Sequence, residues 1–175
     1  MEVTLVGMGP GGAHTLTKAA VEALERADCL IGSRRLLEEW KEIPDTPRFA
    51  ATKSAEMMEI LAGQEWCAPC VLYSGDTGFY SGARTLLPLL QERGIPARVL
   101  PGISSMQYFA AQLGRPWQEW SIVSAHGLSC NPVGEVLAAR GRPVFFLTGS
   151  AGGVGALCQR LTQAGLGHLT ATVGE

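Results

Sequence analysis

Residues 6–12 read Val6-Gly7-Met8-Gly9-Pro10-Gly11-Gly12, and this stretch decides what kind of fold the chain has. It follows the mostly apolar segment 3–6, which predicts a buried first strand. Gly7, Gly9 and Gly12 satisfy the pattern G-x-G-x-x-G, whose glycines let a backbone turn approach a pyrophosphate at the N-terminus of a helix. The stretch is therefore either a dinucleotide-binding turn or a glycine loop with another use.

The residues around this loop disfavour a dinucleotide. The acid that holds a ribose should follow the second strand, about 20 residues further on, whereas Asp28 precedes that strand. Pro10 removes a backbone donor from the middle of the expected anion cradle, and the next helix is predicted only several residues later. Arg34 and Arg35 follow the second strand and could meet a phosphate. A nucleotide-dependent oxidoreductase that uses the Gly7–Gly12 loop is therefore retained as an alternative.

Composition and charge narrow the class of protein. The 175 residues, 46% of them hydrophobic, suffice for one core or two small α/β lobes. A net charge of -2, with no basic run interleaved with aromatics, argues against nucleic-acid binding. Glu2 and a strand follow Met1 directly, and no apolar run approaches about 20 residues, so we expect neither a leader nor a membrane span and place the chain in the cytoplasm. The odd number of cysteines, five, fits free thiols in a reducing compartment.

Apolar runs alternate with helical patterns along the chain, which indicates an α/β protein with mostly parallel sheets. A Gly-Arg-Pro-Trp segment at 114–117 is the expected boundary between an N-terminal lobe, 1–116, and a C-terminal lobe, 117–175. We expect the second lobe to be truncated, because the chain stops directly after a predicted strand. The predicted strands are 3–6, 29–31, 71–73, 97–100, 121–123, 144–147 and 169–173, and the predicted helices are 17–26, 35–41, 54–62, 83–92, 106–113, 133–139 and 154–164.

Two more glycine-containing loops follow predicted strands. SGDTGFYSG occupies residues 74–82 and PGISS occupies residues 101–105. The carboxyl ends of strands are where open α/β sheets bind ligands. Asp76 could accept hydrogen bonds from a hydroxyl or an ammonium group, while Gly75 and Gly78 would let a ligand approach the backbone. Each loop alone is better explained by turn glycines, with Asp76 as a helix cap, but the combination favours a binding site.

The order of these motifs resembles the tetrapyrrole methylase family over nearly all of the chain. GMGPGG, SGDTGFYSG, PGISS and the SAHG of residues 124–127 carry the resemblance, and GSRR at 32–35 is similar in particular to the precorrin C5-methyltransferases of cobalamin biosynthesis. The resemblance implies a two-lobed α/β methyltransferase of non-Rossmann type. It further implies that S-adenosylmethionine binds in the cleft between the lobes, with the macrocycle alongside.

The resemblance also implies which residues form the site. The positions that match cofactor-binding ones in the family are Pro10, Gly75, Asp76, Phe79, Ser104, Ser105 and Leu147. The candidates for substrate contacts are Arg34, Arg35, Tyr80 and His126. The arginine forks suit acetate and propionate groups, although for Arg35 alone solvation of a helix start is the better explanation. His126 is also the one candidate catalytic residue, which either handles a proton or satisfies backbone groups at a strand end. Two positions depart from the family, because Thr77 replaces a common proline and Leu128 replaces a basic residue.

The segment Trp66-Cys67-Ala68-Pro69-Cys70 is similar to a thioredoxin active site. In that fold the first cysteine caps a helix, whereas Cys70 here leads into a predicted strand, which argues against a redox role. A zinc site would need a second ligand pair, and His126 with Cys130 is a weak one, so no metal is predicted.

The chemistry of the implied reaction needs neither a metal nor a covalent enzyme intermediate. A sulfonium methyl group is already activated, and a meso carbon of a reduced tetrapyrrole is nucleophilic, so alignment should supply most of the catalysis. The resemblance therefore implies methylation at C5 of a precorrin or cobalt-precorrin by a homodimer, with a separate C15-methyltransferase/decarboxylase subunit as a partner. The alternative from another class is a non-catalytic tetrapyrrole-binding subunit.

Overall fold

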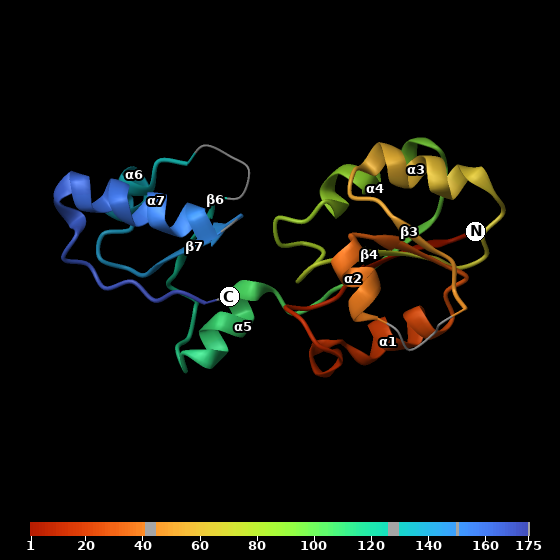
Figure 1. The fold of residues 1–175 in the computed structure, drawn as a ribbon, viewed down its shortest axis with the longest axis horizontal. Coiled ribbons are helices and arrows are strands. Elements are labelled where there is room, and N and C mark those ends of the chain that lie inside the picture. Colours follow the sequence, from red (N-terminus) through yellow and green to blue (C-terminus); the bar gives the residue numbers. More distant parts are fainter. Residues whose placement is uncertain (41–44, 126–129, 150, 175) are drawn as a thin grey trace. The chain divides into compact units, whose positions relative to one another are not determined.

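The computed structural model of the chain describes residues 1–40, 45–125, 130–149 and 151–174 (Figure 1). Its contacts divide the chain into two compact units, Met1–Tyr108 and Phe109–Glu175. Helix α5 (Ser105–Gln112) spans the end of one unit and the start of the other. The lobe boundary after residue 116 stays a prediction.

The first unit is built on a parallel sheet of five strands in the order β3-β2-β4-β1-β5. Strands β1, β2 and β4 are buried along almost their whole length, as is usual where helices cover both faces of a parallel sheet. The strands are β1 (Val3–Gly7), β2 (Cys29–Gly32), β3 (Arg48–Ala50), β4 (Pro69–Tyr73) and β5 (Ala97–Leu100).

Four helices cover the two faces of this sheet (Figure 1). Side chains of α3 and α4 pack with Val3, Leu5 and Ile31 on one face, while those of α1 and α2 pack with Val6 and Leu30 on the other. Neighbouring residues of one strand thus enter different cores, because side chains alternate across a strand. The helices are α1 (Lys18–Glu25), α2 (Arg34–Glu39), α3 (Ser54–Gly63) and α4 (Ala83–Glu92).

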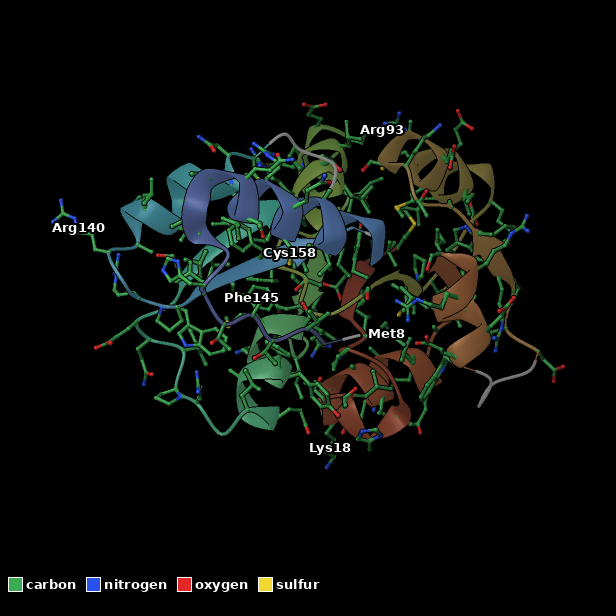
Figure 2. The ribbon with its side chains drawn as sticks, turned by 60° about the vertical axis from the view of Figure 1, so that its left-hand side comes forward. Met8, Lys18, Arg93, Arg140, Phe145 and Cys158 are labelled. Atoms are coloured by element: carbon green, nitrogen blue, oxygen red, sulfur yellow. The ribbon has the colours of Figure 1, made fainter. Side chains whose placement is uncertain are left out.

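The second unit contains two parallel strands, β6 (Ser121–Ala125) and β7 (Val144–Thr148). Its helices are α6 (Pro132–Ala138) and α7 (Ala151–Leu161), and α7 continues into a π-helical turn, Thr162–Leu166. Phe145 of β7 stacks with Trp120 at a centroid distance of 6.4 Å. Charged side chains such as Lys18 in the first unit and Arg140 in the second point outward (Figure 2).

One strand was missed, and one predicted strand is wrong. Strand β3 was not predicted, because its three residues, Arg-Phe-Ala, are too few to show alternation and only partly buried. Residues 169–173 form no strand, and Leu169 and Val173 are 45% and 58% exposed. An apolar run becomes a strand only where a neighbouring strand pairs with its backbone, and none pairs with this segment among the described residues.

No helix in the described part of the chain is long and apolar enough to cross a membrane.

Candidate functional site

Three loops meet at the carboxyl edge of the first unit's sheet. The first loop (residues 8–12) follows β1, the second loop (74–82) follows β4 and the third loop (101–104) follows β5. Strands β4, β1 and β5 are neighbours in the sheet, and parallel strands end at the same edge. The sheet order therefore places the three loops side by side.

Backbone hydrogen bonds join the first loop to the second. Gly9 N donates to Gly75 O at 3.0 Å and Gly75 N donates to Gly9 O at 2.8 Å. Both glycines have a positive φ, 71° and 69°, which L-residues with a side chain rarely adopt. These two glycines thus serve a paired turn in the left-handed conformation that glycine allows, instead of the helix N-terminus that a dinucleotide needs.

The loops approach so closely that two glycines have no room for a side chain. A Cβ on Gly102 would lie 2.2 Å from Gly75 O, and a Cβ on Gly7 would lie 2.5 Å from Gly102 N. Gly102 of the third loop is consequently in direct backbone contact with Gly75 of the second loop and with Gly7 at the end of β1.

Asp76 joins the second loop to the third. Its Oδ1 accepts from Gly78 N at 2.9 Å and its Oδ2 accepts from Gly102 N at 3.0 Å. The interpretation of Asp76 as a helix cap is wrong, because α4 begins only at Ala83, whose N donates to Ser81 Oγ. Each carboxylate oxygen has a second lone pair, so the partly buried Asp76 retains capacity for a ligand.

Thr77 makes a second link between these loops. Its buried hydroxyl donates to Leu100 O at 3.2 Å, at the end of β5. A proline, which the family commonly has at this position, offers no such donor. This link was not predicted from the sequence, where Thr77 stands out only as a departure from the family.

Ser104 at the end of the third loop and Ser105 at the start of α5 differ in how they are used. Ser104 is 2% exposed, and its Oγ accepts from Gln107 N while Gln107 Oε1 accepts from Ser104 N at 3.0 Å. This reciprocal pair is a capping box at the start of α5, whose signal S-x-x-Q is present in the sequence. Ser105, the first residue of the helix, is only partly buried.

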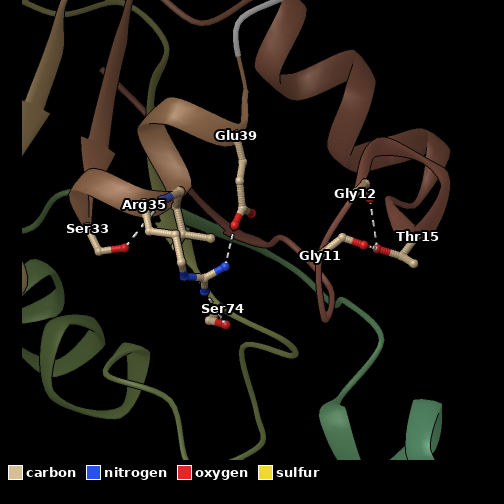
Figure 3. Close-up of polar contacts among 8 residues, drawn as sticks. Gly11, Gly12, Thr15, Ser33, Arg35, Glu39 and Ser74 are labelled. Carbon is tan, nitrogen blue, oxygen red and sulfur yellow. Dashed lines mark hydrogen bonds and ion pairs between the residues drawn. The ribbon is translucent and has the colours of Figure 1, made fainter. Parts of the chain in front are cut away.

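Pro10 lies partly buried in the first loop between Gly9 and Gly11. A 3₁₀ helix, Ala13–Thr15, follows this loop, and Thr15 Oγ1 donates to the carbonyls of Gly11 and Gly12 (Figure 3). The first α-helix begins only at Lys18, after the cap Thr17. The delayed helix start that disfavoured a dinucleotide is thus confirmed.

Phe79 and Tyr80 form an aromatic pair at the tip of the second loop. Their rings meet edge to face at 5.1 Å, and Tyr80 is 56% exposed with a φ of 50°. A positive φ is costly for a bulky residue and is concentrated at functional sites.

The two arginines after β2 start helix α2. Arg34 is exposed, whereas the Arg35 guanidinium contacts Glu39 on its own helix and donates from Nη2 to Ser74 Oγ at 3.0 Å (Figure 3). Ser74 opens the second loop, so Arg35 lies beside that loop. Ser74 and Glu39 were not among the predicted site residues, although the four-residue spacing of Arg35 and Glu39 on a helix is a usable signal.

The remaining two predicted site residues are Leu147 and His126. Leu147 lies on β7 of the second unit, in register with Ser124. His126, like the departure at Leu128, lies outside the described residues.

The cysteine segment lies at the amino edge of the sheet. Cys67 N and Ala68 N donate to the carboxylate of Asp28, which holds the turn before β4. Burial raises the pKa of Cys29 and of Cys70 to about 12, so both thiols stay protonated near neutral pH. Such thiols are poor nucleophiles, which agrees with the argument from the sequence against a redox role for this segment.

Comparisons with known proteins identify the family. The family model of the Tetrapyrrole (Corrin/Porphyrin) Methylases matches residues 2–174. The chain is 34% identical to the cobalt-precorrin-7 C(5)-methyltransferase of Salmonella typhimurium, over 99% of this chain and 84% of the relative. The chain therefore belongs to the tetrapyrrole methylase family, as its motifs indicated.

Solved structures agree with this assignment. A cobalamin-biosynthesis precorrin-6Y methylase from Archaeoglobus fulgidus matches with a TM-score of 0.60 and 28% identity, over 71% of this chain and 65% of that one. A uroporphyrin-III C-methyltransferase from Thermus thermophilus, in complex with S-adenosyl homocysteine, matches with a TM-score of 0.59 and 21% identity, over 76% and 60%. The second likeness shows the fold alone.

Proposed function

We propose that the chain is an S-adenosylmethionine-dependent methyltransferase that methylates C5 of a precorrin-type macrocycle in cobalamin biosynthesis. The observation that carries this proposal is the 34% identity to the Salmonella C(5)-methyltransferase across 99% of the chain. The three interlocked loops support it, because they are the segments in which most of the family's cofactor positions fall.

The loops fit a cofactor of this kind. A Cβ added at Gly11 would meet no atom within 4 Å, so the backbone there is open to a ligand, whereas Gly75 is buried and a Cβ there would contact Ser104 Cα and Ser105 N at 3.8 Å. Asp76 adds a carboxylate that would complement a positively charged group. We propose that Pro10, Gly75, Asp76 and Phe79 hold the cofactor together with Ser104, Ser105 and Leu147.

When bound, S-adenosylmethionine supplies a methyl group activated by its sulfonium. This chain's residues then contribute alignment, since holding the reacting atoms about 3 to 3.5 Å apart replaces an encounter in solution. The glycine contacts and the Asp76 hydrogen bonds fix the loops relative to one another, which is the preorganisation that such alignment needs. We assign Tyr80, Arg34 and Arg35 to the macrocycle, and keep His126 as the candidate for proton handling.

The proposal includes a cytoplasmic homodimer and a separate subunit for the C15 reaction. A Sinorhizobium protein named precorrin-6Y C(5,15)-methyltransferase [decarboxylating] is 29% identical over 99% of this chain but only 41% of that protein. The match thus covers less than half of the protein whose printed name combines the two activities.

Calorimetric titration with S-adenosylhomocysteine, followed by transfer of a labelled methyl group to a precorrin, tests the proposal. Binding followed by transfer supports it, whereas binding without transfer would favour a non-catalytic tetrapyrrole-binding subunit. Binding of a nicotinamide cofactor instead would favour the oxidoreductase. In a complex, S-adenosylhomocysteine should contact Pro10, Gly75, Asp76, Ser104 and Ser105, and a ligand bound elsewhere would overturn the site.

A further inference from the structure

Arg35 is fixed at two points that belong to different segments of the chain. Its Nη1 pairs with Glu39 Oε1 one helical turn later, and its Nη2 donates to Ser74 Oγ, 39 residues away (Figure 3). Glu39 and Ser74 therefore set the direction of the guanidinium beside the second loop.

The fixed guanidinium stays accessible. The side chain of Arg35 is 54% exposed and that of Glu39 is 35% exposed. A guanidinium carries five N–H donors in a fixed fork, and two of them suffice for these contacts. Among the described residues no other acceptor contacts it, so donors remain for an incoming carboxylate, which is the group that this fork pairs with best.

The other ion pairs along helices in the described part of the chain lack this second anchor. Lys18 and Glu22 lie 3.8 Å apart with side chains 91% and 50% exposed, and Lys53 and Glu56 lie 3.7 Å apart. Pairs of that kind contribute little and leave both side chains mobile. The anchor from Ser74 distinguishes Arg35, because a pre-oriented side chain loses less conformational entropy when a ligand binds.

We propose that Arg35 binds a carboxylate of the substrate and that Ser74 and Glu39 are positioning residues for it. This inference rests on the proposed function and specifies the substrate as a macrocycle with acidic side chains. Ser74 is followed directly by Gly75 and Asp76, so a carboxylate on Arg35 would place the macrocycle beside the proposed cofactor loops.

Glu39 adds selectivity to this contact. Its negative charge lies against the guanidinium, so an incoming anion must share Arg35 with it. A single free carboxylate competes poorly there, whereas a macrocycle held by several carboxylates supplies the binding energy from other contacts. Removal of the Glu39 charge should therefore tighten the binding of small carboxylates more than that of the macrocycle.

The test compares the variants Arg35→Gln, Ser74→Ala, Ser74→Thr and Glu39→Gln. The control is Glu22→Gln, which removes an exposed ion pair of the same spacing on α1. Methyl transfer gives KM and kcat, tryptophan quenching by a porphyrin with acetate and propionate side chains gives tetrapyrrole affinity, and calorimetry gives the affinity for S-adenosylhomocysteine.

Arg35→Gln should raise KM roughly tenfold or more, because it removes a hydrogen bond from a charged group to a carboxylate. Ser74→Ala should raise KM by a smaller factor, Ser74→Thr should restore it, and Glu39→Gln should let acetate inhibit at lower concentration. The affinity for S-adenosylhomocysteine and the melting temperature should stay those of the control.

Unchanged KM and porphyrin affinity in Arg35→Gln and Ser74→Ala, in an active enzyme, would overturn this inference and leave the proposed function intact. If the protein without any substitution binds neither S-adenosylhomocysteine nor the porphyrin, both this inference and the proposed function would be overturned.

Discussion

Two aspartates at opposite edges of the first unit's sheet have the same local chemistry. Asp28 precedes β2 at the amino edge and accepts from Cys67 N and Ala68 N. Asp76 follows β4 at the carboxyl edge and accepts from Gly78 N and Gly102 N. Both are partly buried, and both tie one segment of backbone to another. Hydrogen bonds to a carboxylate therefore do not by themselves identify a site.

The backbone around the two aspartates differs. Glycines with positive φ, the strained Tyr80 and glycine contacts that exclude a Cβ surround Asp76, whereas buried thiols and a regular strand start surround Asp28. Strained backbone persists only where the surroundings impose it, and it is concentrated at functional sites. The comparison predicts that changes at the carboxyl edge affect ligand binding, while changes at the amino edge affect stability alone.

The largest effect is expected from Gly102→Ala. The new Cβ would lie 2.2 Å from Gly75 O, and the backbone cannot move aside as a flexible side chain could. Forcing an extra carbon into a packed site destabilises by roughly 1–3 kcal/mol or more, and here it would also separate the loops. Thermal unfolding and calorimetry with S-adenosylhomocysteine should both show a loss.

Gly63→Ala is the matched control, since a Cβ at Gly63, the last residue of α3, meets no atom within 4 Å. Its melting temperature and ligand affinity should equal or exceed those of the unchanged protein. If Gly102→Ala behaved like Gly63→Ala, the close contact of the three loops would be wrong.

The paired variants Asp76→Asn and Asp28→Asn directly compare the roles of the carboxyl edge and the amino edge. An amide keeps one acceptor oxygen and loses the charge, so each variant should lose some stability, about 1 kcal/mol. Asp76→Asn should also weaken cofactor binding about tenfold, because a hydrogen bond to a charged group contributes roughly 1.5–3 kcal/mol. Asp28→Asn should leave that affinity unchanged.

Affinity and thermal midpoint should be measured on the same samples. Unchanged affinity in Asp76→Asn would remove this residue from the proposed site, and lost affinity in Asp28→Asn would remove the distinction between the edges.

A smaller effect is expected from Thr77→Val, which has nearly the same shape as threonine but lacks the hydroxyl. The variant leaves the Leu100 carbonyl without its donor, which should lower the unfolding free energy by about 1 kcal/mol. Urea denaturation measures this change, with Thr85→Val as a control because the Thr85 hydroxyl lies on the exposed start of α4. If both variants lost the same unfolding free energy, the hydrogen bond from Thr77 would contribute no more than one at an exposed helix start.

The sequence predicted those parts of the fold that depend on residues close to one another in the chain. Helix α4 was predicted with its observed bounds, and the glycine motifs placed the three loops after the correct strands. The contacts between loops were not predictable in the same way. The bond from Gly102 N to Asp76 spans 26 residues and exists only because β4, β1 and β5 are neighbours, and the pattern of apolar residues does not specify strand order. Strand β3 escaped prediction for the same reason, since its three residues form a strand through pairing with β2.

The smallest effect is expected at the cysteines of the amino edge. Cys67 is exposed, whereas Cys29 and Cys70 are buried with a pKa raised to about 12. Because the folded protein holds these two thiol protons more tightly than the unfolded chain, their contribution to stability is complete below about pH 8.5 and is lost as the pH rises toward 12.

Near neutral pH, iodoacetamide treatment followed by mass spectrometry should therefore show modification of Cys67 well before Cys29 or Cys70, which should react only after unfolding. Cys67→Ser should change stability by less than about 0.5 kcal/mol, as for other surface positions, and should not change the affinity for S-adenosylhomocysteine. Rapid modification of Cys70 in the folded protein, or a loss of ligand affinity in Cys67→Ser, would show that the amino edge takes part in function and that the contrast between the two aspartates is wrong.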